Sequence, residues 1–74
     1  MPSVTPEQLA QRSAFGVRVR AARLQLGISQ EDLGHRAAID RTYVGSVERG
    51  ERNVSLDNIY RLAKALGVEP GTLL

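Results

Sequence analysis

The sequence predicts an all-α domain of five helices. Apolar residues recur at intervals of three and four, and residues typical of helix N-caps precede the apolar stretches. No stretch alternates apolar and polar residues as a half-buried strand does. Because 74 residues suffice for one domain, we expect a single compact domain over residues 1–74, with residues 1–4 frayed.

The first helix is expected over residues 5–26, with Thr5 as N-cap and Pro6 at the first helical position. Gly16 lowers the helix propensity in the middle, which leaves a break near this residue as an alternative. The residues expected on the inward face are Phe15, Val19, Ala22 and Leu26.

The next three helices each follow a capping side chain, namely Ser29, Asp40 and Ser55. Gly50 and Gly67 are expected to end the third and fourth of the five helices. The expected ranges are 30–38, 41–49 and 56–66, with a short last helix after Pro70.

Residues 30–47 are expected to form two short helices joined by a tight turn. The spacing places Leu33, Ala37, Val44 and Val47 on the inward side. It leaves Arg41, Thr42, Tyr43 and Ser46 on the outer side of the second helix. A guanidinium, two hydroxyls and a phenol on one face suit a groove of DNA. The alternative is an ordinary helical hairpin with a solvated face.

Composition excludes several classes of function. The chain has no cysteine, and its single histidine, His35, lacks a cluster of carboxylates at metal-ligand spacing, so we expect neither a metal nor a cofactor. There is no catalytic triad pattern and no glycine-rich phosphate loop, so we expect no enzyme. We also expect a cytoplasmic protein with no membrane partner, because no apolar run reaches about 18 residues and no signal peptide is apparent.

Residues 30–47 resemble the helix-turn-helix of the lambda-repressor-like proteins, also called the Cro/cI or XRE family. The similarity extends through residues 15–29 and 47–74, so that about sixty residues are covered. The segments 40–44 and 48–56 resemble more narrowly the controller proteins of restriction-modification systems. Two positions depart from the family pattern: Gly34 stands where alanine is usual, and Ala38 where the turn often has glycine.

The resemblance and the helical phase together suggest a set of DNA-binding residues. Arg41 could donate to guanine and Thr42 could contact a thymine methyl, although either could instead contact a phosphate. Gln30 lies at a helix N-terminus, which suits a phosphate, but it could be merely solvated. The full set is Gln30, Arg41, Thr42, Tyr43, Ser46, Arg52, Asn53 and Ser55. For Tyr43 the alternative is packing against the preceding helix, and Ser55 is also expected to cap a helix.

Two further groups have structural roles. The resemblance implies an ion pair between Arg23 and Glu48, which would join the first helix to the third. A bundle of this size is not expected to cover all of its C-terminal apolar side chains, so we expect a homodimer interface there. The residues of that interface are Ile59, Tyr60, Leu66, Val68, Leu73 and Leu74.

These expectations define a sequence-specific transcriptional regulator that binds double-stranded DNA as a homodimer on a near-palindromic operator. The narrower interpretation is a restriction-modification controller protein, with RNA polymerase as a further candidate partner. The alternatives are a generic phage-type repressor, an antitoxin-type regulator, or a helical module that binds another protein.

Overall fold

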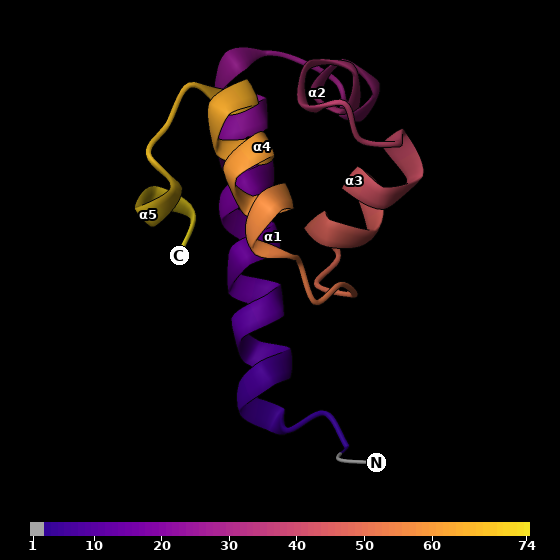
Figure 1. The fold of residues 1–74 in the computed structure, drawn as a ribbon, viewed down its shortest axis with the longest axis vertical. Helices are drawn as coiled ribbons and strands as arrows, with labels where there is room; N and C mark the ends of the chain where they lie inside the picture. The colour runs from indigo at the N-terminus through magenta and orange to yellow at the C-terminus, as the bar shows by residue number, and fades with distance from the viewer. Residues whose placement is uncertain (1–2) are drawn as a thin grey trace.

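A computed structural model describes residues 3–74, which form five helices and no strand (Figure 1). The helices are α1 (Pro6–Leu26), α2 (Gln30–Ala37), α3 (Arg41–Glu48), α4 (Leu56–Leu66) and α5 (Pro70–Leu73). The predicted all-α class is confirmed. Of the residues expected to fray, 1 and 2 lie outside the described residues, and 3 and 4 precede α1 without helical structure. None of the helices within residues 3–74 has the length and apolarity needed to cross a membrane.

The helices pack around one apolar core. The helices α2 and α3 lie on one side of the pair formed by α1 and α4, and α5 lies on the other side (Figure 1). The first turns of α1 extend beyond the other helices (Figure 1). The buried apolar residues are Phe15, Val19, Leu33, Ala37, Val44, Val47, Leu62, Ala63, Leu66 and Leu73.

Local capping explains where the helices begin. Thr5 accepts a hydrogen bond from the backbone N–H of Gln8, and the Gln8 side chain accepts one from the backbone N–H of Thr5, which completes a capping box. Ser29 and Asp32 form the same arrangement at α2. These reciprocal bonds satisfy donors that the first turn of a helix leaves free.

Gly16 allows α1 and α3 to touch through their backbones. The helix α1 is continuous through this residue, so the alternative of a break is not realised. A Cβ atom at position 16 would lie 2.8 Å from the carbonyl oxygen of Glu48 and closer still to that of Val47. The low helix propensity of glycine is therefore offset by a contact that a larger side chain would prevent.

The prediction of which residues of α1 face inward is wrong at the C-terminal end of the helix. Leu26 is 47% exposed, whereas Arg23 is buried at 7%. Leu26 is the last residue of the helix, and Gly27 turns the chain away immediately after it, with φ of 70°. Arg23 takes the inward position because its charge has a partner on α3.

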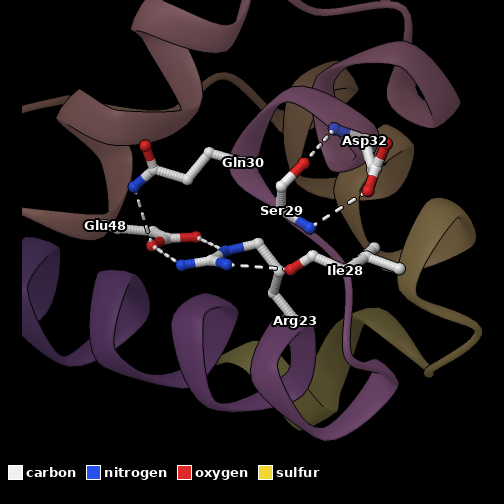
Figure 2. A network of polar contacts seen from close by, with 6 residues as sticks. All are labelled: Arg23, Ile28, Ser29, Gln30, Asp32 and Glu48. Atoms are coloured by element: carbon white, nitrogen blue, oxygen red, sulfur yellow. Dashed lines mark hydrogen bonds and ion pairs between the residues drawn. The ribbon is translucent and has the colours of Figure 1, made fainter.

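That partner is Glu48, and the two side chains form a bidentate ion pair (Figure 2). The Nε and Nη2 atoms of Arg23 donate to the two carboxylate oxygens of Glu48 at 2.7 and 2.9 Å. The third guanidinium nitrogen, Nη1, donates to the carbonyl oxygen of Ile28 at 2.9 Å. Only 9% and 3% of the two side chains are exposed, and the carboxylate raises the pKa of Arg23. The pair therefore ties α1, the chain leading into α2, and α3 together.

Both departures from the family pattern, Gly34 in α2 and Ala38 just after it, shape the turn between α2 and α3. Ala38 has φ of 56° and ψ of 44°, which is the left-handed region that glycine prefers. A Cβ atom at Gly34 would lie 2.6 Å from the carbonyl oxygen of Ile39. The backbone N–H of Ile39 also donates to the carbonyl oxygen of Gly34 at 2.9 Å. The glycine thus permits a close turn, while the alanine stores strain in it.

Ala38→Gly should stabilise the protein. The left-handed conformation costs a residue with a Cβ atom about 1–2 kcal/mol, and part of this is offset because glycine is more flexible in the unfolded chain. We expect a net gain of up to about 1 kcal/mol and an increase in Tm of up to about 8 °C for a domain of this size. Ala21→Gly, at an exposed right-handed position of α1, is the matched control and should lower Tm. A decrease in Tm for Ala38→Gly would contradict this account of the turn.

Glu48→Ala should destabilise the fold by about 3–5 kcal/mol, because it leaves the buried Arg23 charge without its partner. Urea unfolding would measure the loss. The exposed pair between Arg49 and Glu51 provides the control, and Glu51→Ala should leave the urea midpoint nearly unchanged. Replacing both buried partners together, as Arg23→Met with Glu48→Leu, should recover much of the loss. An unchanged midpoint for Glu48→Ala would exclude a structural role for the pair.

Candidate nucleic-acid interface

The first turn of α3 exposes two of the predicted DNA-binding residues. Arg41 and Thr42 are both exposed, whereas the four residues after Tyr43, at positions 44–47, are buried. Asp40 caps the helix by accepting a hydrogen bond from the backbone N–H of Thr42 at 2.7 Å. This bond lowers the pKa of Asp40, so the cap is a carboxylate at neutral pH. The cap fixes the start of α3 and hence the position of the two exposed side chains.

Arg41 has an acidic neighbour that the sequence did not indicate. Its Nη1 atom lies 3.6 Å from a carboxylate oxygen of Glu31, at the start of α2. The two side chains are 69% and 67% exposed, so water screens the attraction and the pair adds little stability. Arg41 is therefore held loosely and remains available to another acceptor. The crossing of α2 and α3 brings Glu31 to this place, and no local sequence pattern signals it.

Ser46 was expected on the outer face of α3, and that prediction is wrong. The residue is 5% exposed, and its hydroxyl donates to the carbonyl oxygen of Tyr43 at 2.7 Å. The hydroxyl oxygen of Ser46 in turn accepts a hydrogen bond from the Nε atom of Arg52 at 2.8 Å. Arg52 belongs to the segment after α3, and its return to the helix covers Ser46. The serine thus positions an arginine and does not itself face solvent.

Tyr43 is half-buried between the apolar core and Arg52. It packs against the apolar core, and the guanidinium carbon of Arg52 lies 5.1 Å from the centre of its ring. A cation over an aromatic face is attracted by the ring's charge distribution. Tyr43, Ser46 and Arg52 therefore form one cluster. Contacts within it hold the guanidinium of Arg52 against α3, although Arg52 as a whole is exposed to solvent.

Gln30 is turned toward the buried ion pair. Its Nε2 atom donates to Glu48 at 3.1 Å, which gives the carboxylate a third hydrogen bond (Figure 2). The residue is the first of α2, where backbone N–H groups lack acceptors within the helix. An open pocket lies beside this turn, and its lining residues are Arg23, Ser29, Gln30, Glu31 and Arg41.

The two remaining predicted DNA contacts lie in or near the segment before α4. Asn53 is exposed. Ser55 caps α4 by accepting a hydrogen bond from the backbone N–H of Asn58 at 3.2 Å, as the sequence predicted. Its hydroxyl therefore has a structural partner, and the residue remains exposed.

The residues expected at a dimer interface fall into two groups. Leu66 and Leu73 are only 3% and 1% exposed within one copy, so their assignment to an interface is wrong. They fill the space between α4, α5 and the rest of the core, which the short last helix closes. The residues that remain partly or largely exposed are Ile59, Tyr60, Val68 and Leu74.

The arrangement offers binding chemistry. A guanidinium and a hydroxyl lie at the exposed N-terminal end of α3. A second guanidinium, that of Arg52, is held beside the same helix at Tyr43 and Ser46. These are donors suited to base edges and phosphates. Within residues 3–74, no group of three side chains of the metal-binding types is placed to hold an ion.

Known proteins are similar to this chain in sequence and in fold. A helix-turn-helix family model matches residues 19–73. The control protein C.BamHI of Bacillus amyloliquefaciens is 52% identical over 64 residues, which are 85% of this chain and 79% of that protein. A hypothetical transcription factor of Neisseria meningitidis is 39% identical and covers the whole chain, with 70% of its own length matched.

A solved structure agrees with these sequence matches. The restriction-modification controller protein C.AhdI of Aeromonas hydrophila superimposes with a TM-score of 0.86 at 52% identity. The match covers 88% of this chain and 98% of C.AhdI. The chain belongs to the helix-turn-helix family of XRE type, in which restriction-modification controller proteins are among its relatives.

Proposed function

We propose that the protein regulates transcription by binding a specific DNA sequence with α3 in the major groove. The observation that supports this most directly is the exposure of Arg41 and Thr42 at the N-terminal turn of α3, the part of a recognition helix that meets base edges. The buried pair of Arg23 and Glu48 holds the helix at a fixed angle to the rest of the domain. The protein acts in the cytoplasm, and it acts by binding DNA and not by catalysing a reaction.

The backbone contacts come from the flanks of the recognition helix. Gln30 and the free N–H groups of the first turn of α2 meet a phosphate, since a helix N-terminus favours an anion. Arg52 and Asn53 meet the flanking backbone or minor groove, and Tyr43 holds Arg52 in place. Ser46 acts through Arg52, and Ser55 borders the same surface.

The more specific proposal is a controller protein of a restriction-modification system. It rests on the identity of 52% to both C.BamHI and C.AhdI. Such a regulator acts as a homodimer on a near-palindromic operator, with RNA polymerase as a second partner. The two copies meet through α4 and α5, where Tyr60 and Leu74 are 57% and 67% exposed and Ile59 and Val68 border them.

Arg41→Ala should remove sequence preference more than general DNA affinity. Selection of bound sequences from a random duplex library first identifies the preferred site. Loss of one bidentate base contact costs about 1–3 kcal/mol, so affinity for that site should fall roughly tenfold or more while affinity for unrelated duplexes falls little.

Arg36→Ala is the matched control for this loss of one positive charge. Arg36 is exposed on α2, about 140° around that helix from Glu31, the neighbour of Arg41. Its removal should affect the preferred and unrelated duplexes alike. Titrations at several salt concentrations should show affinity falling with salt as phosphate contacts require. If the native protein preferred no duplex at any salt concentration, the helices would instead form a module that binds another protein.

Tyr60→Lys should convert a dimer to a monomer without unfolding it, because the side chain is exposed within one copy. Sedimentation at tens of micromolar should show a dimer for the native chain and a monomer for the variant. Operator affinity should fall as well, since two recognition helices about 34 Å apart bind together. Val17→Ser, at an exposed apolar residue of α1, should remain dimeric. A monomeric native protein at this concentration would contradict the proposed interface.

A further inference from the structure

The helix α1 has apolar residues on two opposite sides. Its inward side includes the buried Phe15 and Val19. On the other side, residues follow one another at intervals of four and three, and they share one face because an α-helix turns about 100° per residue. We call this set the outer apolar face of α1, and its members are Ala10, Ala14, Val17, Ala21 and Leu24.

The outer apolar face is uncovered within residues 3–74. Val17 is 63% exposed and Leu24 is 55% exposed, Ala10 and Ala21 are exposed, and Ala14 is half-buried. The helices in contact with α1 are α3, α4 and α5, and Val17 and Leu24 remain largely exposed beside them. A surface helix normally turns polar residues to solvent opposite its buried stripe, and a helix that is apolar on both sides is normally enclosed on both.

The spacing of the face suits contact with another helix. Intervals of four and three repeat every seven residues, which is the pattern by which two helices interlock side chains along a common seam. The face extends from Ala10 to Leu24, a distance of about 21 Å along α1. Such a length accommodates about four turns of a partner helix.

The charges beside the face determine which partner helix fits. Arg18 and Arg20 flank it, each about 80° around the helix from its centre, and both are exposed. Arg18 makes one long hydrogen bond, at 3.3 Å, to the carbonyl oxygen of Leu74. The one acidic residue of α1, Glu7, lies in its first turn, away from both arginines. When two copies of this face meet at Val17, in either direction, Glu7 of one copy lies at least about 10 Å along the helix axis from Arg18 and Arg20 of the other. An acidic helix can instead place carboxylates beside both arginines.

We propose that the outer apolar face of α1 docks an acidic amphipathic helix of another protein. Apolar side chains of the partner contact Val17, Ala21 and Leu24, and its aspartates or glutamates pair with Arg18 and Arg20. The face is separate from α3, whose C-terminal residues Val47 and Glu48 contact α1 at Gly16. The proposal therefore does not depend on which DNA sequence the protein binds.

Two synthetic helical peptides test the proposal against the full chain. Both have leucines in the same heptad seam, and the flanking positions are glutamates in one and lysines in the other. Fluorescence anisotropy should show the glutamate peptide binding at least tenfold more tightly. Val17→Ser combined with Leu24→Ser should abolish this binding, and circular dichroism should show that the exposed substitutions leave the helices intact. Leu56→Ser, at a 67% exposed apolar residue of α4, should bind as the native chain does.

Charge reversal separates this partner from the other candidates. Arg18→Glu with Arg20→Glu should reverse the preference, so that the lysine peptide binds more tightly. Absence of binding, equal binding of both peptides, or an equal loss for Leu56→Ser would overturn the proposal. A dimer that becomes a monomer with Val17→Ser and Leu24→Ser would make the face an interface between copies. If charge reversal weakened duplex binding and left peptide binding unchanged, the arginines would belong to a nucleic-acid surface. That result and the loss of the dimer would each overturn the proposal.

Discussion

The buried pair of Arg23 and Glu48 is the interaction on which the arrangement of the other elements depends. Burial of two charges costs solvation energy, which is recovered only when the geometry is good and the other polar atoms have partners. Here the carboxylate accepts from two nitrogens of Arg23 and from Gln30, and the remaining guanidinium nitrogen donates to Ile28. One cluster thus joins three segments of the chain, and α3 is positioned by electrostatics as well as by the packing of Val44 and Val47.

Features that depend on neighbouring residues could be predicted from the sequence. The caps at Thr5, Ser29 and Ser55 and the left-handed ends at Gly27 and Gly67 arise from contacts within a few residues, and the helix starts follow from them. Prediction was less successful where a distant segment determines the environment. The periodicity of α3 places Ser46 outward, but Arg52 returns from the following segment and covers it. The periodicity of α1 places Leu26 inward, but Leu26 is exposed and Arg23 takes the inward position because it pairs with the distant Glu48.

The candidate site divides in the same way. Helical phase and the Asp40 cap were sufficient to indicate that Arg41 and Thr42 are exposed, because both depend on α3 alone. The proximity of Glu31 to Arg41 depends on how two helices cross, and the sequence contains no signal for it. Leu66 and Leu73 illustrate a related difficulty, because an apolar stripe is the same pattern whether it closes one copy or joins two.

The close contact at Gly16 has a consequence for how such a domain can change. The helix α3 meets α1 through main-chain carbonyl groups, which are the same whatever side chains α3 presents to solvent. Substitutions at Arg41 and Thr42 therefore leave the contact between α3 and α1 intact. A regulator built in this way can acquire a new target sequence by exchanging a few exposed residues, while its stability and the angle of its recognition helix are inherited. The packing of α3 within the domain and its preference for a DNA sequence are then separate properties, which selection or design can change independently.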